Sequence, residues 1–170
     1  IEEKATISKL NDELLYEKCY HCFQDLVAPF ACPQCNGAAY CDETCQKLSW
    51  ENDGHKIECK YLASLMCLER PSHMMFRMIL FGLKNDEGYF RVDCEAGETV
   101  GEFDKNSYKK MLDLHEETPA NFENLKTMFL QAAGFLKILE QENIIDTKKH
   151  NFNKIWNVTV LHGMQYFANG

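Results

Sequence analysis

Eight cysteine and histidine side chains in the first third of the chain occur in four pairs with the spacing of metal ligands. Thiolate and imidazole are ligands that Zn²⁺ prefers, and a gap of two residues lets both sulfurs of one turn reach the same ion. A gap of three residues places two side chains one helical turn apart, which predicts helices at the last two pairs. The pairs are Cys19 and Cys22, Cys32 and Cys35, Cys41 and Cys45, and His55 and Cys59.

Eight ligands in four pairs are sufficient for two closed tetrahedral zinc sites. A closed site leaves no position for an activated water, so we predict two structural zinc ions and no metalloenzyme chemistry. Residues 19–59 hold seven of the nine cysteines but few large aliphatic side chains. A structural zinc contributes roughly 10–16 kcal/mol of apparent binding energy at neutral pH, which could supply the missing stability.

Other interpretations of these residues are less favourable. Buried core thiols would not be expected to fall into four pairs, and a disulfide framework is typical of secreted proteins, whereas no signal peptide opens this chain. We therefore expect a protein of the cell interior, in the nucleus or the cytoplasm. His21 could compete as a ligand, but neighbouring cysteines already complete the set. Cys67, on an apolar helical stretch, is expected to be a small core residue, and Cys94 stands alone. His73, His150 and His162 are expected on helix faces or at the surface.

The rest of the chain has a helical pattern. From Lys60 onward Leu and Met recur at helical spacing, and Pro71 can open a second helix. After Thr118 and Pro119, which suit the start of a helix, one apolar stripe is predicted to face the core: Phe122, Leu125, Phe129, Ala132, Leu136 and Leu139. A last helix is predicted over about 146–167, with Phe152, Ile155, Trp156, Val160, Leu161 and Met164 inward.

These patterns predict a mainly α fold, in which a small two-zinc module precedes an antiparallel helical bundle. Residues 1–18 form a lead-in whose residues 5–10 alternate like one strand, residues 19–59 form the zinc module, and residues 60–170 form the helical region. No apolar run approaches the ~20 residues that cross a bilayer, so no membrane partner is expected.

The charge of the chain argues against nucleic acid as a partner. The formal net charge is −8, and residues 19–59 hold six acidic residues and two lysines. Seven thiolates would also exceed the charge of two zinc ions. Phosphates would be repelled by a module this negative.

The pattern of the zinc module resembles the MYND finger. Besides the metal ligands, Tyr40, Gln46 and Trp50 stand where that family has its Tyr-Cys, Gln and Trp positions. The resemblance implies interleaved pairing, with Cys19, Cys22, Cys41 and Cys45 on one zinc and Cys32, Cys35, His55 and Cys59 on the other. Spacing alone leaves a sequential pairing equally open.

MYND fingers bind proline-rich peptides in a groove. The resemblance implies that Gln46 and Trp50 line this groove, with Tyr40 nearby. An aromatic face suits the preformed polyproline conformation. In the alternative interpretation, Trp50 packs over the helix of the finger as part of a miniature core; both roles are compatible.

The flanks of the finger resemble SMYD proteins, lysine methyltransferases whose SET domain is split by a MYND finger and a helical insert. The resemblance is carried by "KATISKL", similar to the last strand of the N-terminal SET portion, and by "SYKKMLDLHEE", "NFENLKTMFLQAAGFLKILEQENI" and "VTVLHGMQYFANG". It implies that residues 60–170 are the SET insert, and that residues 1–18 end in an edge strand of the split SET domain.

By this resemblance the complete parent protein would transfer a methyl group from S-adenosylmethionine to a lysine of a histone or another protein. Because the chain begins at Ile1 and holds no Asn-His-Ser-Cys segment, we expect a fragment that is not active alone. It would have no catalytic residues of its own and no assignable cofactor-binding residues, and Glu117 stands about where the family has a cofactor-facing His or Asn. The alternative is a non-catalytic MYND adaptor that recruits proline-rich partners.

Overall fold

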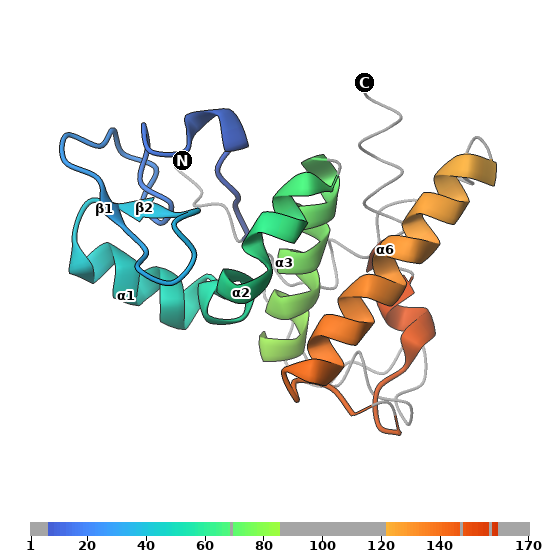
Figure 1. Cartoon of the computed structure of the whole chain (residues 1–170). Helices are drawn as coiled ribbons and strands as arrows, with labels where there is room; N and C mark the ends of the chain where they lie inside the picture. Colours follow the sequence, from blue (N-terminus) through green and yellow to red (C-terminus); the bar gives the residue numbers. More distant parts are fainter. Residues whose placement is uncertain (1–6, 69, 86–121, 147, 157, 160–170) are drawn as a thin grey trace, which may run out of the picture. The chain divides into compact units, whose positions relative to one another are not determined.

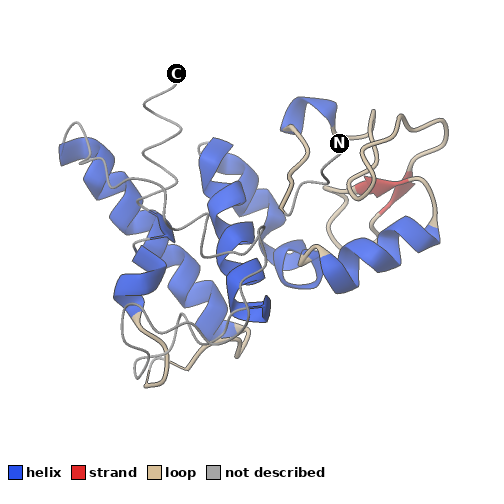
Figure 2. Cartoon of the chain, turned by 180° about the vertical axis from the view of Figure 1, so that it is seen from behind, coloured by secondary structure: helices blue, strands red, loops and turns tan. Residues whose placement is uncertain are grey.

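The computed structural model describes residues 7–68, 70–85, 122–146, 148–156 and 158–159. The chain divides into two compact units, Ile1–Arg77 and Met78–Gly170. The described residues are mainly helical, as predicted, and the two-stranded sheet β1-β2 is the one sheet among them (Figures 1 and 2). No helix in the described ranges is long and apolar enough to cross a membrane. Predictions for residues 86–121 and 160–170 lie outside the described part of the chain.

The first unit begins with a 3-10 helix, η1 (Asp12–Leu14), followed by strands β1 (Phe30–Ala31) and β2 (Ala39–Tyr40). The strands pair antiparallel, with Phe30 opposite Tyr40. Helices α1 (Glu43–Asn52) and α2 (His55–Cys67) follow, and α3 (Arg70–Asn85) begins in this unit. Pro71 lies in the first turn of α3, where a missing backbone N–H costs nothing. The two predicted helices after the finger are therefore present, but α2 starts inside the finger at His55. The prediction that Cys67 is a core residue is wrong, because it is the last residue of α2 and is exposed.

Short local signals set the ends of α1 and α2. The Asp42 carboxylate accepts a hydrogen bond from the Cys45 N–H at 2.9 Å and caps α1. Gly54, with φ of 86°, turns the chain from α1 into α2 in a conformation that side chains disfavour. The prediction that Cys41 lies on a helix is wrong, because the cap residue follows it and the helix begins at Glu43.

The predicted strand over residues 5–10 is wrong for its described part. Residues 7–10 have no strand partner in the described chain. A strand needs a neighbour to take up its backbone hydrogen bonds. Here the carbonyl of Ser8 instead accepts a hydrogen bond from Nη1 of Arg77, at 2.5 Å.

In the second unit, α6 (Phe122–Gln141) is the long helix that the sequence predicts. Its buried face holds Met128, Ala132, Phe135 and Leu139. The predicted stripe is therefore right at Ala132 and Leu139 but wrong at Phe129, whose side chain is 52% exposed.

The last helix starts later than predicted. Asp146 begins a turn in which its carbonyl accepts hydrogen bonds from the N–H groups of Lys149 and His150, and the first helical residue is 152. Ile155 is fully buried, as predicted, and Trp156 lies edge-on to Phe129 with ring centroids 5.7 Å apart.

Candidate metal centre

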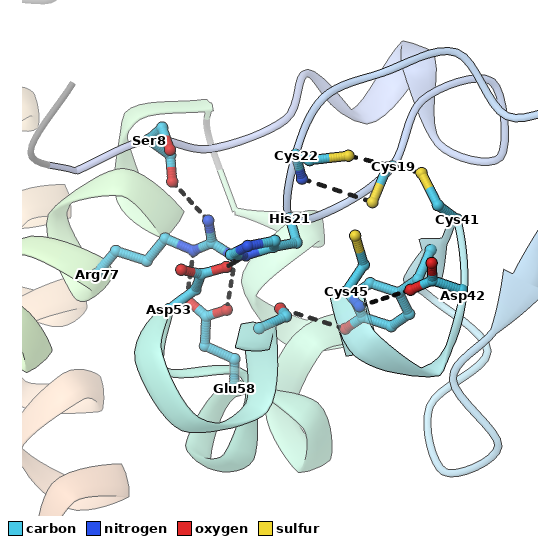
Figure 3. Close-up of polar contacts among 12 residues, drawn as sticks. Ser8, Cys19, His21, Cys22, Cys41, Asp42, Cys45, Asp53, Glu58 and Arg77 are labelled. Carbon is cyan, nitrogen blue, oxygen red and sulfur yellow. Dashed lines mark hydrogen bonds and ion pairs between the residues drawn. The ribbon is translucent and has the colours of Figure 1, made fainter. Parts of the chain in front are cut away.

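The eight predicted ligands come together in two groups of four. The first comprises Cys19, Cys22, Cys41 and Cys45, the second Cys32, Cys35, His55 and Cys59, and in each group the donor atoms lie within 4.8 Å of one another. Figure 3 shows the sulfur atoms of the first group converging from separate segments. This is the interleaved grouping that the resemblance to the MYND finger implies, not the sequential one.

The spacing of the donor atoms fits a tetrahedral ion. Four sulfurs at about 2.3 Å from a central zinc would be about 3.8 Å apart from one another. The structure has 3.5 Å between the sulfurs of Cys22 and Cys41, and 3.8 Å between those of Cys32 and Cys59. Nε2 of His55 lies 3.7 Å from the sulfur of Cys35. Both groups therefore fit the zinc sites of a MYND finger.

The two Cys-x2-Cys turns have the same backbone conformation. In each, the residue after the second cysteine has a positive φ, 63° at Phe23 and 50° at Asn36. The N–H of each of these residues donates to the carbonyl of the first cysteine, at 3.0 Å for Cys19 and 3.1 Å for Cys32. Each turn thus places two sulfurs on one side of a tight loop, which is the arrangement that one metal ion needs.

Backbone amides also point at the sulfur atoms. The N–H of Cys22 donates to the sulfur of Cys19 at 3.5 Å, and the N–H of Gly37 donates to that of Cys35 at 3.4 Å. Such hydrogen bonds stabilise a thiolate relative to a thiol. Burial raises the pKa of Cys19, but backbone N–H groups, that of Cys22 first, outweigh it and bring the pKa to about 7.

Other thiols of each group would stay protonated at neutral pH without a cation beside them. A side-chain hydrogen bond with Cys22 raises the pKa of Cys41 to about 11, and burial together with the charge of Cys35 raises the pKa of Cys59 to about 12. Thiolates so close together repel one another unless a positive ion lies between them. Burial lowers the pKa of His55 and favours the neutral imidazole, the form that binds metal. A divalent ion of the zinc type therefore suits both donor sets, since thiolate and imidazole are its preferred ligands.

An aromatic cluster surrounds His55. The rings of Tyr20, Tyr40 and Trp50 pack edge-on against the imidazole, with centroid distances of 5.5, 6.1 and 6.0 Å. Tyr40 is fully buried, and its hydroxyl donates to Ser49 at 3.4 Å. In this conformation Tyr40 therefore supports the finger from inside and offers no surface to a peptide. Trp50 and Gln46 are both partly exposed, so Trp50 belongs to the core of the finger and also reaches its surface.

His21 is not among the atoms of either cluster. Its Nδ1 lies 2.6 Å from Oδ2 of Asp53, which follows α1 (Figure 3). The contact ties the first cysteine turn to the end of α1. The prediction that His21 is not part of the ligand set agrees with this position.

A buried ion-pair network beside the second cluster was not predicted. The carboxylate of Glu58, on α2 next to Cys59, is 0% exposed and accepts hydrogen bonds from Nε and Nη2 of Arg77, at 2.8 and 2.9 Å. Nε2 of His73 lies 3.1 Å from the same carboxylate, and His73 is 1% exposed, so it lies on a helix face but not at the surface. The sequence contains one sign of this network, a single arginine inside the apolar run "MMFRMILF", which indicates a buried partner of opposite charge.

The network determines the charge state of Glu58. Burial alone would raise the pKa of this carboxyl, but the Arg77 guanidinium and the hydrogen bond with His73 outweigh it and hold the pKa at about 2. Glu58 is therefore ionised at neutral pH although it is fully buried, which is stable only while its partners stay in place.

Comparison with known proteins gives matches in this part of the chain. Residues 19–59 match the MYND finger family. The chain is 32% identical over 79 residues to the protein-lysine N-methyltransferase SMYD4 of Danio rerio, a match that covers 42% of this chain and 10% of that protein. It is 42% identical over 57 residues to the histone-lysine N-methyltransferase Smyd1 of Mus musculus, covering 34% of this chain and 11% of that protein.

The chain thus spans only about a tenth of the length of these curated relatives. The predicted resemblance to SMYD proteins is confirmed where the finger lies.

Proposed function

We propose that this chain, which carries a MYND zinc finger similar to those of SMYD methyltransferases, is the zinc-binding interaction portion of a SMYD-like protein lysine methyltransferase. The chain itself binds other proteins, and the complete parent transfers the methyl group of S-adenosylmethionine to a protein lysine. The observation that supports this most is the pair of four-donor clusters. Each has all four positions filled by protein, which suits a scaffold and not a metal-activated reaction.

The binding surface that we propose lies on α1, at Gln46 and Trp50. Both are partly exposed and lie four residues apart, so they share one face of the helix. The contact with His55 holds the indole of Trp50 in place. An aromatic ring that is ordered before binding loses little entropy when a ligand docks, and a proline-rich segment is ordered in the same way.

Titration with a proline-rich peptide tests this binding. We expect Trp50→Ala to weaken binding by at least about tenfold, because buried aromatic anchors contribute most of the energy of such interfaces. Gln46→Ala provides a second variant that leaves the contact between Trp50 and His55 intact. Leu48→Ala is the matched control, since Leu48 is 36% exposed and lies on the same helix.

Zinc content is measured for each variant, so that a loss of binding is not confused with a loss of metal. Wild-type affinity in both Trp50→Ala and Gln46→Ala would contradict the proposed surface.

Methyl transfer is tested on the full-length parent protein. Transfer of a labelled methyl group from S-adenosylmethionine to histone or other protein lysines is the expected result. A parent protein that binds proline-rich peptides but transfers no methyl group would instead be a non-catalytic adaptor. The acidic finger argues for protein partners over nucleic acid in either case.

A further inference from the structure

One arginine contacts three segments of the first unit that are distant in sequence. Nη1 of Arg77 donates to the carbonyl of Ser8 at 2.5 Å, and its guanidinium lies 4.9 Å from the centre of the Tyr20 ring. Its Nε and Nη2 groups donate hydrogen bonds to the carboxylate of Glu58. Figure 3 shows the side chain of Arg77 between Ser8 and Glu58. Arg77 is 4% exposed, so these contacts are largely shielded from water.

The contact with Glu58 acts on the segment that carries two metal ligands. Glu58 lies between His55 and Cys59 in the first turns of α2. The two hydrogen bonds from Arg77 form a bidentate fork, which fixes both the distance and the angle of the carboxylate. His73, one turn before Arg77 on α3, contacts the same carboxylate. The position of α2, and with it the positions of the two ligands, therefore depends on α3.

A second route runs through Tyr20. The ring of Tyr20 lies under the guanidinium of Arg77 and packs edge-on against the imidazole of His55. Tyr20 is 2% exposed, so it has little room to move. A substitution of Arg77 can therefore displace His55 in two ways, through a shift of α2 and through a shift of the Tyr20 ring.

We propose that Arg77 is a positioning residue of the second metal site, so that the working finger extends to Arg77 instead of ending at Cys59. Without the guanidinium, Glu58 would be a buried charge without its main partner, and α2 would have to shift until water reached the carboxylate. This shift would displace His55 and Cys59. The four ligands of the first site lie outside α2, and Arg77 contacts their segment only at Tyr20, without a hydrogen bond, so that site would be affected less.

Cobalt binding to the full chain tests the proposal. Co²⁺ replaces Zn²⁺ in such sites and absorbs visible light, and its ligand-field bands differ between the first site, with four sulfur ligands, and the second, with one nitrogen ligand. Each site can therefore be titrated separately. We expect Arg77→Met to lower the cobalt affinity of the second site by roughly 10- to 100-fold, as is typical when a group that orients metal ligands is lost. The first site should change less.

Three further variants serve as controls. Lys56→Met removes a cation from an exposed position next to His55 and should keep wild-type affinity at both sites. Arg77→Lys keeps the charge but not the planar fork, so its loss should be intermediate. Adding Glu58→Gln to Arg77→Met should recover part of the affinity, since a neutral amide needs no cation.

Wild-type affinity of the second site in both Arg77 variants, or equal weakening of both sites, would overturn the proposal. If Arg77→Met does not fold, Arg77→Lys decides: a loss confined to the second site supports the proposal, and unchanged affinity refutes it.

Discussion

Substitution of alanine for Gly37 or for Gly134 is expected to have opposite effects on stability. A methyl group added at Gly37 would lie 2.9 Å from Cδ2 and 3.5 Å from Cγ of Leu62. Leu62 is 1% exposed and packs in the core of the finger, so it cannot turn away into solvent. At Gly134 on α6, by contrast, an added methyl group meets no atom within 4 Å.

The magnitudes follow from these contacts. Overpacking of a core by one methyl group typically costs about 1–3 kcal/mol, and we expect Gly37→Ala to lower the free energy of unfolding of the finger by this amount. Any shift of the backbone would also disturb the hydrogen bond from the Gly37 N–H to the sulfur of Cys35. Gly134→Ala should raise the stability of the second unit by roughly 0.5–1 kcal/mol, because alanine loses less backbone entropy in a helix than glycine.

Urea unfolding of the zinc-loaded chain measures both effects. The chain has two tryptophans, so Trp156→Phe leaves Trp50 as a reporter of the finger, and Trp50→Phe leaves Trp156 as a reporter of the second unit. Adding Leu62→Val should reduce the cost of Gly37→Ala, because it removes a methyl group near the clash. A Gly37→Ala variant as stable as its parent, or a cost that Leu62→Val does not change, would refute this packing argument.

The remaining predictions concern metal, capping and charge. A chelator should unfold the finger and change the emission of Trp50 while that of Trp156 persists; an unchanged Trp50 signal after zinc removal would contradict the structural role of the metal. Asp42→Ala removes the side chain that caps α1 and should cost about 1 kcal/mol in urea unfolding, whereas Asp42→Asn should be nearly neutral. Glu58→Gln should cost about 3 kcal/mol at neutral pH, since the native pKa of about 2 lies well below the ordinary 4.5. Because a lowered pKa stabilises above the unfolded value of about 4.5, the full effect is present at neutral pH, and a Glu58→Gln variant as stable as wild type there would contradict the prediction.

The metal ligands and the helices were predictable because they leave local signals. A two-residue gap between cysteines forces a tight turn, and the structure has that turn at both Cys19 and Cys32. Helices α2 and α3 follow from apolar spacing and from Pro71. The grouping of the ligands into two sites, by contrast, leaves no local signal in the sequence. Spacing permits both sequential and interleaved pairing, and only the resemblance to the MYND finger favoured the one that the structure has.

Features that depend on tertiary packing were not predictable from local pattern. Glu58 and Arg77 are 19 residues apart and meet only because α2 and α3 pack together there. The buried face of α6 includes Met128 and Phe135, while Phe129 is 52% exposed. Apolar periodicity shows that a helix has a buried face, but neighbouring apolar residues leave its exact rotation open.

Native mass spectrometry of the purified chain, which weighs the protein with its bound metal, tests the central claim most directly. Our account predicts a mass increase that corresponds to two zinc ions per chain, with all nine cysteines unoxidised. A single zinc ion, no zinc, or a mass that shows paired cysteines oxidised to disulfides would contradict it.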